Sequence, residues 1–155
     1  MFVMTAKVNK RKLLILLAAL IALAAAVSLI VSSVKKGAAA SGGAVVKDNG
    51  QRVAYLRSLG WEVAEEPVDQ QSILIPRDFS GVYAEYNKLQ KAQGFDLEKY
   101  GGMEAMRYTY SVTNHPTGDT SVVADIIVYR NEVVAGDVQS TALDGFMAGL
   151  SYPKS

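Results

Sequence analysis

The sequence contains no cysteine and a single histidine among its 155 residues. Without cysteine the chain cannot form a disulfide bond, a thiolate metal site, a cysteine nucleophile or a lipid-modified cysteine. His115 is the only imidazole available as a general base. The chain also lacks an EF-hand loop and a glycine-rich phosphate loop before a helix. We therefore expect no metal and no cofactor.

The chain as a whole also has little net charge, because 16 basic and 15 acidic residues give a net charge of +1. The two signs are nevertheless separated along the sequence. Six basic residues precede Val45, and every acidic residue follows it, which leaves the part from Val45 onward with a net charge of −5. An acidic domain is poorly suited to the phosphate backbone, so we expect no nucleic acid partner.

A long uncharged run, LLILLAALIALAAAVSLIVSSV, occupies residues 13–34. A helix of this length matches the roughly 30 Å hydrocarbon core of a bilayer, so the run predicts a transmembrane helix in contact with lipid. A cleaved signal peptide is the alternative, because basic residues precede the run and alanine-rich sites follow. The greater number of basic residues before the run predicts a cytoplasmic N-terminus and an extracytoplasmic remainder at the cell membrane.

The expected organisation is a cytoplasmic segment 1–12, a transmembrane helix 13–34, a flexible tether 35–47 and an extracytoplasmic domain 48–152. Within that domain, Asp48 or Asn49 is expected to cap a helix that ends at Gly60. A second helix follows Asp78 or Ser80, with an apolar stripe that should lie on a sheet; the stripe comprises Phe79, Val82, Tyr83, Tyr86 and Leu89.

Alternating or apolar segments predict the strands. Short strands are expected at 61–65 and 72–75, and a three-stranded antiparallel meander at 105–113, 120–130 and 133–140. The tail 143–150 is expected to close over an edge of the sheet or to form a short helix. The predicted fold is therefore α+β: an N-terminal transmembrane helix, then two helices packed on a mostly antiparallel sheet.

Candidate catalytic residues are few. Asp125 and Asp137 lie in adjacent predicted strands and form a conceivable carboxylate pair for glycoside hydrolysis, whereas a cross-strand ion pair of Arg107 with Asp125 is the structural alternative. His115, in the turn Asn-His-Pro-Thr-Gly-Asp, is either a general base or an ordinary exposed turn residue. Glu65, which lies in an acidic loop, suits solvent better than Ca²⁺.

Four segments resemble a bacterial family described only as domain of unknown function 4830, found mainly in clostridia and relatives. The segments that carry the resemblance are Tyr86–Leu97, Arg107–Tyr110, Val133–Val138 and Gly145–Met147. The similarity covers roughly residues 49–150. It implies a Gram-positive cell-surface setting and a membrane anchor, and it assigns no catalytic residues.

These observations lead to two hypotheses about function. The first is a non-enzymatic, single-pass membrane protein whose outer domain binds an envelope protein or a cell-wall component. The second is an envelope hydrolase that uses Asp125 and Asp137, or His115. Convergent carboxylates in a pocket would favour the hydrolase, and a flat or edge-strand surface would favour the binding protein.

Overall fold

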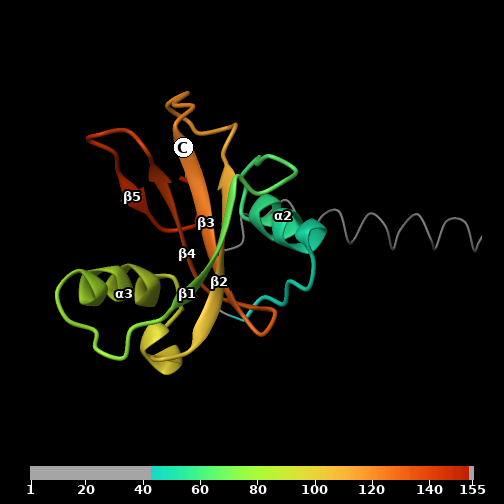
Figure 1. Ribbon diagram of the computed structural model, residues 1–155. Coiled ribbons are helices and arrows are strands. Elements are labelled where there is room, and N and C mark those ends of the chain that lie inside the picture. The colour runs from blue at the N-terminus through green and yellow to red at the C-terminus, as the bar shows by residue number, and fades with distance from the viewer. Residues whose placement is uncertain (1–42, 154–155) are drawn as a thin grey trace, which may run out of the picture. The chain divides into compact units, whose positions relative to one another are not determined.

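The computed structural model describes residues 43–153, which form a five-stranded antiparallel sheet with a helix on each side (Figure 1). The strands lie in the sheet in chain order, so the sheet is a continuous meander. The elements in chain order are α2 (Asn49–Ser58), β1 (Asp69–Leu74), α3 (Val82–Ala92), the 3₁₀ helix η1 (Leu97–Tyr100), β2 (Glu104–Ser111), β3 (Val122–Tyr129), β4 (Glu132–Ser140) and β5 (Met147–Ala148).

Helix α2 covers one face of the sheet, which we call the α2 face. The Asp48 side chain caps the helix by accepting a hydrogen bond from the backbone N–H of Gln51 at 2.8 Å. Gly60, with φ +104°, permits the chain to leave the helix. The apolar core of this face comprises Val46, Val53, Leu56, Leu59, Trp61, Val63, Phe95, Tyr110, Val112, Val122, Ala124, Ile126, Val128, Val133, Val138 and Leu150.

Helix α3 and η1 cover the opposite face, which we call the α3 face. Its buried apolar cluster is smaller and comprises Ile75, Leu97, Ala105, Ile127, Val134 and Ala135. All four buried polar residues of the described part of the chain, Asn87, Gln90, Asp125 and Asp137, lie on α3 or on the strand positions that face it. The two faces of one sheet therefore differ in chemistry, and the polar one is the place to look for a site.

The structure corrects several expectations about the strands. The segment 61–65 is not a strand, because only Val63 forms a bridge, to Val112. The strand expected at 72–75 begins earlier, at Asp69, where the exposed edge position tolerates polar side chains that give no apolar alternation. The tail contributes β5, so the meander has five strands in place of three.

The predicted fold is also wrong in its N-terminal transmembrane helix, which the structure does not support. Helices α2 and α3 have 10 and 11 residues, and within residues 43–153 no helix is both long and apolar enough to cross a bilayer. The expected segments 1–12 and 13–34, and most of the tether 35–47, lie outside the described residues.

Candidate functional site

A tight turn and an irregularity in the pairing of β3 and β4 set the register that brings two carboxylates together. Arg130 and Asn131 form the turn with positive φ values of 48° and 69°, the conformation that suits a two-residue hairpin. A shift of one residue between Ile127 and Val128 then places Asp125 directly opposite Asp137. Both side chains point to the α3 face, where they are 4 % and 2 % exposed. Two acidic groups are thus buried side by side.

Both carboxylate oxygens of Asp125 accept hydrogen bonds from side chains on neighbouring strands. The Thr109 hydroxyl, from the paired position on β2, donates a short hydrogen bond to Oδ1. The Gln139 amide, from β4, donates to Oδ2 at 2.7 Å. Two donors of this kind compensate an ionised carboxylate for the loss of water. Asp125 therefore lies in a hydrogen-bonded network that joins three strands.

Only one carboxylate oxygen of Asp137 has a hydrogen-bond partner among the described residues. The Tyr86 hydroxyl, from α3, donates to Oδ1 at 2.6 Å, whereas Oδ2 is buried without a hydrogen-bond partner among the described residues. Burial, and secondarily the charge of Asp125, raise the pKa of Asp137 to about 7. Burial and Asp137 also raise the pKa of Tyr86, so that the phenol stays a donor. Asp137 is therefore a buried acid that titrates near neutral pH.

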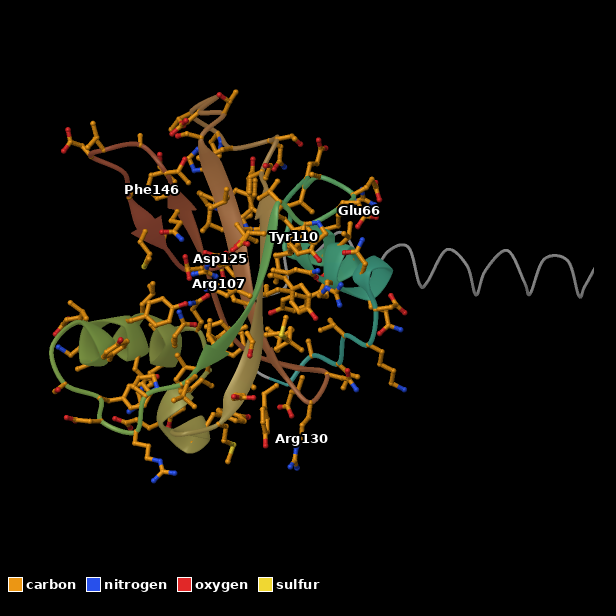
Figure 2. The ribbon with its side chains drawn as sticks, in the orientation of Figure 1. Glu66, Arg107, Tyr110, Asp125, Arg130 and Phe146 are labelled. Carbon is orange, nitrogen blue, oxygen red and sulfur yellow. The ribbon has the colours of Figure 1, made fainter. Side chains whose placement is uncertain are left out.

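Arg107 lies on the same face but faces neither carboxylate directly. Its register partner on β3 is Ile127, and its Nη2 atom contacts Asp69 Oδ2 at 3.1 Å and Gln71 Oε1 at 3.0 Å on β1. The anticipated ion pair with Asp125 is therefore replaced by one with Asp69 at the sheet edge. In Figure 2, Arg107 and Asp125 are labelled close to each other on the sheet.

The geometry limits what the carboxylates can do chemically. The raised pKa of Asp137 suits a general acid, and Asp125 is a second carboxyl group beside it, as in a hydrolytic pair. However, both are almost completely covered, so a substrate would reach them only after Tyr86 or Gln139 moved. In the arrangement observed, the pair joins β2, β3, β4 and α3.

His115 lies apart from this pair. Its ring stacks on Trp61 at a centroid distance of 6.0 Å and on Phe146 at 5.0 Å, and its Nδ1 is 2.8 Å from the Thr117 hydroxyl oxygen. Trp61 belongs to the core of the α2 face. The structure therefore does not assemble His115 with Asp125 and Asp137, and the three predicted candidates do not form one site.

Sequence reasoning missed a concavity, a groove between α3 and β5. Its volume is about 890 Å³, and it is lined by Gly81, Val82, Tyr83, Glu85, Tyr86, Leu89 and Met147. These include most of the apolar stripe that was expected to lie on the sheet. Instead, Val82 is 78 % exposed and Tyr83 is 52 % exposed, while Asn87 and Gln90 are the buried residues of the helix. Helix α3 is thus rotated relative to the prediction: Tyr86 packs on the sheet as expected, whereas Val82 and Tyr83 are exposed.

This rotation has a cause in the edge of β4. Strand β5 has only two residues, so the backbone of Gly136 extends beyond its partner. Gln90 Oε1 accepts a hydrogen bond from the Gly136 N–H at 3.0 Å, and Gln93 Nε2 donates to its carbonyl at 3.1 Å. Gln93 Oε1 also accepts from the Leu150 N–H at 2.6 Å. The glutamines replace a missing strand, which requires Gln90 and Gln93 to face inward while Glu85, Lys88 and Lys91 stay at the surface.

Metal binding gains no support from the geometry. Across residues 43–153, no three acidic or histidine side chains converge in a way that could hold an ion. Glu65, from the acidic loop considered above, instead accepts a hydrogen bond from Arg57 at 2.5 Å at the surface.

Comparison with known proteins gives one positive result. The family model described as "Domain of unknown function (DUF4830)" matches residues 55–138, more than half of the chain. No curated protein and no solved structure matches. The matched range runs from α2 to β4 and includes α3, Arg107, Asp125 and Asp137. The resemblance of the sequence is therefore confirmed, and the chain belongs to the DUF4830 family.

Proposed function

We propose that this domain is a non-enzymatic binding module that holds an apolar segment of a protein partner in the groove between α3 and β5. The observation that carries the proposal is the orientation of α3. A helix on a sheet normally buries its apolar stripe. Here Asn87 and Gln90 are buried, Val82 and Tyr83 are exposed, and the stripe forms one wall of a groove, with Met147 on the other wall.

The exposed stripe is costly for the isolated domain and cannot be hidden by rotating α3. Apolar surface in water costs roughly 25 cal/mol per Å². Turning the helix to bury Val82 and Tyr83 would remove Gln90 and Gln93 from Gly136, leaving buried backbone groups unpaired at about 1–3 kcal/mol each. A partner's apolar side chains can cover the stripe without that loss, and this supports a docking role.

The class of partner and the location are parts of the same proposal. An envelope protein or a cell-wall component outside the cytoplasm is favoured by the sequence features of residues 7–36 and by the acidic charge from Val45 onward. A reporter enzyme fused after Ser155 tests the location, since a reporter that works only outside the cytoplasm should be active. Activity of a reporter that works only inside would contradict it.

A hydrolase that uses Asp125 and Asp137 is the second candidate function. The observation in its favour is that Asp137 has a pKa raised to about 7 beside a second carboxylate. Its burial argues against it. Hydrolysis of purified cell-wall glycan by the full-length protein, lost in both Asp125→Asn and Asp137→Asn while the fold is retained, would establish the hydrolase and overturn the binding proposal.

Photocrosslinking in native cells tests the binding proposal directly. A photoreactive amino acid is placed at Tyr83 in the groove and, as a control, at Val68, which is similarly exposed but does not line the groove. We expect one defined protein adduct from position 83 and none from position 68. Equal labelling from both positions would show that the groove is not the binding surface.

A further inference from the structure

We propose that a separate pocket on the α3 face binds a small, uncharged, mostly apolar molecule through one oxygen atom, which accepts a hydrogen bond from the Arg107 Nε–H. The pocket has a volume of about 360 Å³ and lies between the edge strand β1 and the beginning of α3. It shares Tyr83 and Tyr86 with the groove but extends in the other direction, toward β1. The inference goes beyond the proposed function, because it concerns a small molecule and a different pocket.

The pocket is built from apolar side chains around a single charged residue. Arg107 and Ile127, which lie opposite each other on β2 and β3, line it from the sheet. Ile73 from β1 and Tyr86 from α3 line it from two sides, and both pack on the buried apolar cluster of this face. Pockets for small molecules span roughly 300–1,000 Å³ and combine apolar walls with a few polar groups that orient the ligand. This pocket is of that kind, at the lower end of the range.

Arg107 contributes a polar group that the protein leaves without a partner. Its Nη2 atom contacts Asp69 and Gln71 on β1, whereas its Nε is buried with no hydrogen-bond partner among the described residues. A buried N–H without an acceptor is costly, because it has lost its hydrogen bonds to water and gained none in return. Since Arg107 lines the pocket, an oxygen atom of a bound molecule can remove this cost.

The carboxyl groups on the same face do not supply this acceptor. The oxygens of Asp125 accept from side chains on β2 and β4, and Tyr86 donates to Asp137. Within the described part of the chain, the ion pair of Arg107 is formed with Asp69 instead. A molecule bound in the pocket can supply the acceptor that these groups do not.

The charges around Arg107 favour a ligand without charge. Asp69 lies 3.1 Å from the guanidinium and balances it, and Asp125 and Asp137 are buried on the same face. An anion would therefore be desolvated near two further carboxyl groups without meeting an unpaired cation. The Nε–H requires an acceptor and not a charge. Ketone, ester and amide oxygens provide that acceptor in an uncharged molecule.

Three small aromatic compounds test the acceptor and the charge. Propiophenone has an uncharged carbonyl oxygen, n-propylbenzene has a similar shape without it, and benzoate carries a negative charge. Each is titrated into the full-length protein and followed by NMR, in which the Arg107 Nε–H signal reports on its acceptor. We expect propiophenone to shift that signal and to bind about tenfold more tightly than n-propylbenzene, and benzoate to bind more weakly than propiophenone. Equal affinities for the first two compounds, or tightest binding of benzoate, would overturn the inference.

The role of Arg107 is tested by Arg107→Met, which keeps an extended side chain and removes the guanidinium. The preference for propiophenone should disappear in this variant, while continued binding of n-propylbenzene shows that the pocket is intact. Arg57→Met is the matched control, because it also removes an ion-paired arginine, at the surface beside Glu65. It should keep the preference. A preference that persists in Arg107→Met would overturn the inference, and the comparison of compounds on the wild type decides it if this variant does not fold.

A groove variant separates this inference from the proposed function. Val82 lines the groove and not this pocket, so Val82→Lys should leave the affinity for propiophenone unchanged. Loss of propiophenone binding in Val82→Lys would place the compound in the groove and overturn the inference. Failure of the groove to bind a protein partner would overturn the proposed function alone.

Discussion

The two faces of the sheet are held by different interactions. On the α2 face, 16 buried apolar residues form one cluster around α2 and Trp61. On the α3 face, six buried apolar residues are accompanied by buried amides and carboxylates, and α3 is attached by hydrogen bonds from its side chains. The difference teaches that one face supplies stability, while the other holds a helix in an orientation that leaves its apolar side free.

The largest expected effect tests the α2 face. Trp61 is 2 % exposed and donates from Nε1 to the Leu150 carbonyl at 2.7 Å. Trp61→Ala should lower the free energy of unfolding by about 3–5 kcal/mol, because it leaves a large cavity and an unpaired carbonyl. Urea unfolding measures this loss. Tyr83→Ala, an aromatic truncation on the α3 side, should lower the free energy of unfolding by less than about 1 kcal/mol. Equal losses in the two variants would contradict the difference in stability proposed for the two faces.

The second prediction concerns the pH dependence contributed by the α3 face. Because the pKa of Asp137 is raised from 3.8 to about 7, the folded protein binds more protons than the unfolded chain in that interval. Its contribution to stability is thus complete below pH 4 and is lost as the pH rises to 7. Asp137→Asn should remove this slope, worth on the order of 1–4 kcal/mol, in urea titrations from pH 4 to 8.

A control for this titration is Asp119→Asn. Hydrogen bonds from Ser121 lower the pKa of Asp119, so its stabilisation is present at neutral pH and is lost as the pH falls. That loss falls below the ordinary pKa of 3.8, so Asp119→Asn should leave the slope between pH 4 and 8 intact, whereas Asp137→Asn should remove it. An unchanged slope in Asp137→Asn would mean that the buried carboxyl does not titrate as proposed.

The third prediction tests how α3 is attached. Gln90→Leu keeps the size of the side chain but leaves the Gly136 N–H without its acceptor. The expected loss is about 1–3 kcal/mol, smaller than that of Trp61→Ala, and amide hydrogen exchange at Gly136 should accelerate. Gln90→Glu retains an acceptor and serves as the comparison. If Gln90→Leu is as stable as the wild type, the hydrogen bonds do not fix the orientation of the helix.

The sequence was sufficient for elements whose signals are local. The cap at Asp48, the glycine at position 60 and the turn before β4 each act within a few residues, and the structure has them where expected. The order of the strands also followed, which placed Asp125 and Asp137 near each other, but the expected facing of Arg107 and Asp125 was wrong, because Arg107 lies opposite Ile127.

The groove could not be predicted in the same way, because its cause is nonlocal. The apolar stripe of α3 predicts burial of Val82 and Tyr83 by periodicity alone. The opposite result depends on β5 being too short to pair with Gly136, 46 residues away from Gln90. Two glutamines three residues apart were the available signal, but their significance appears only once the edge of β4 is known.

The central claim, that the free apolar side of α3 is a binding surface, is tested most directly by combining Val82→Lys with the photocrosslinker at Tyr83. Val82 is exposed, so the lysine should change the free energy of unfolding by less than about 0.5 kcal/mol. The account predicts that the defined adduct from position 83 disappears in this variant and persists in Val68→Lys. An adduct that persists undiminished in a stably folded Val82→Lys protein would contradict it.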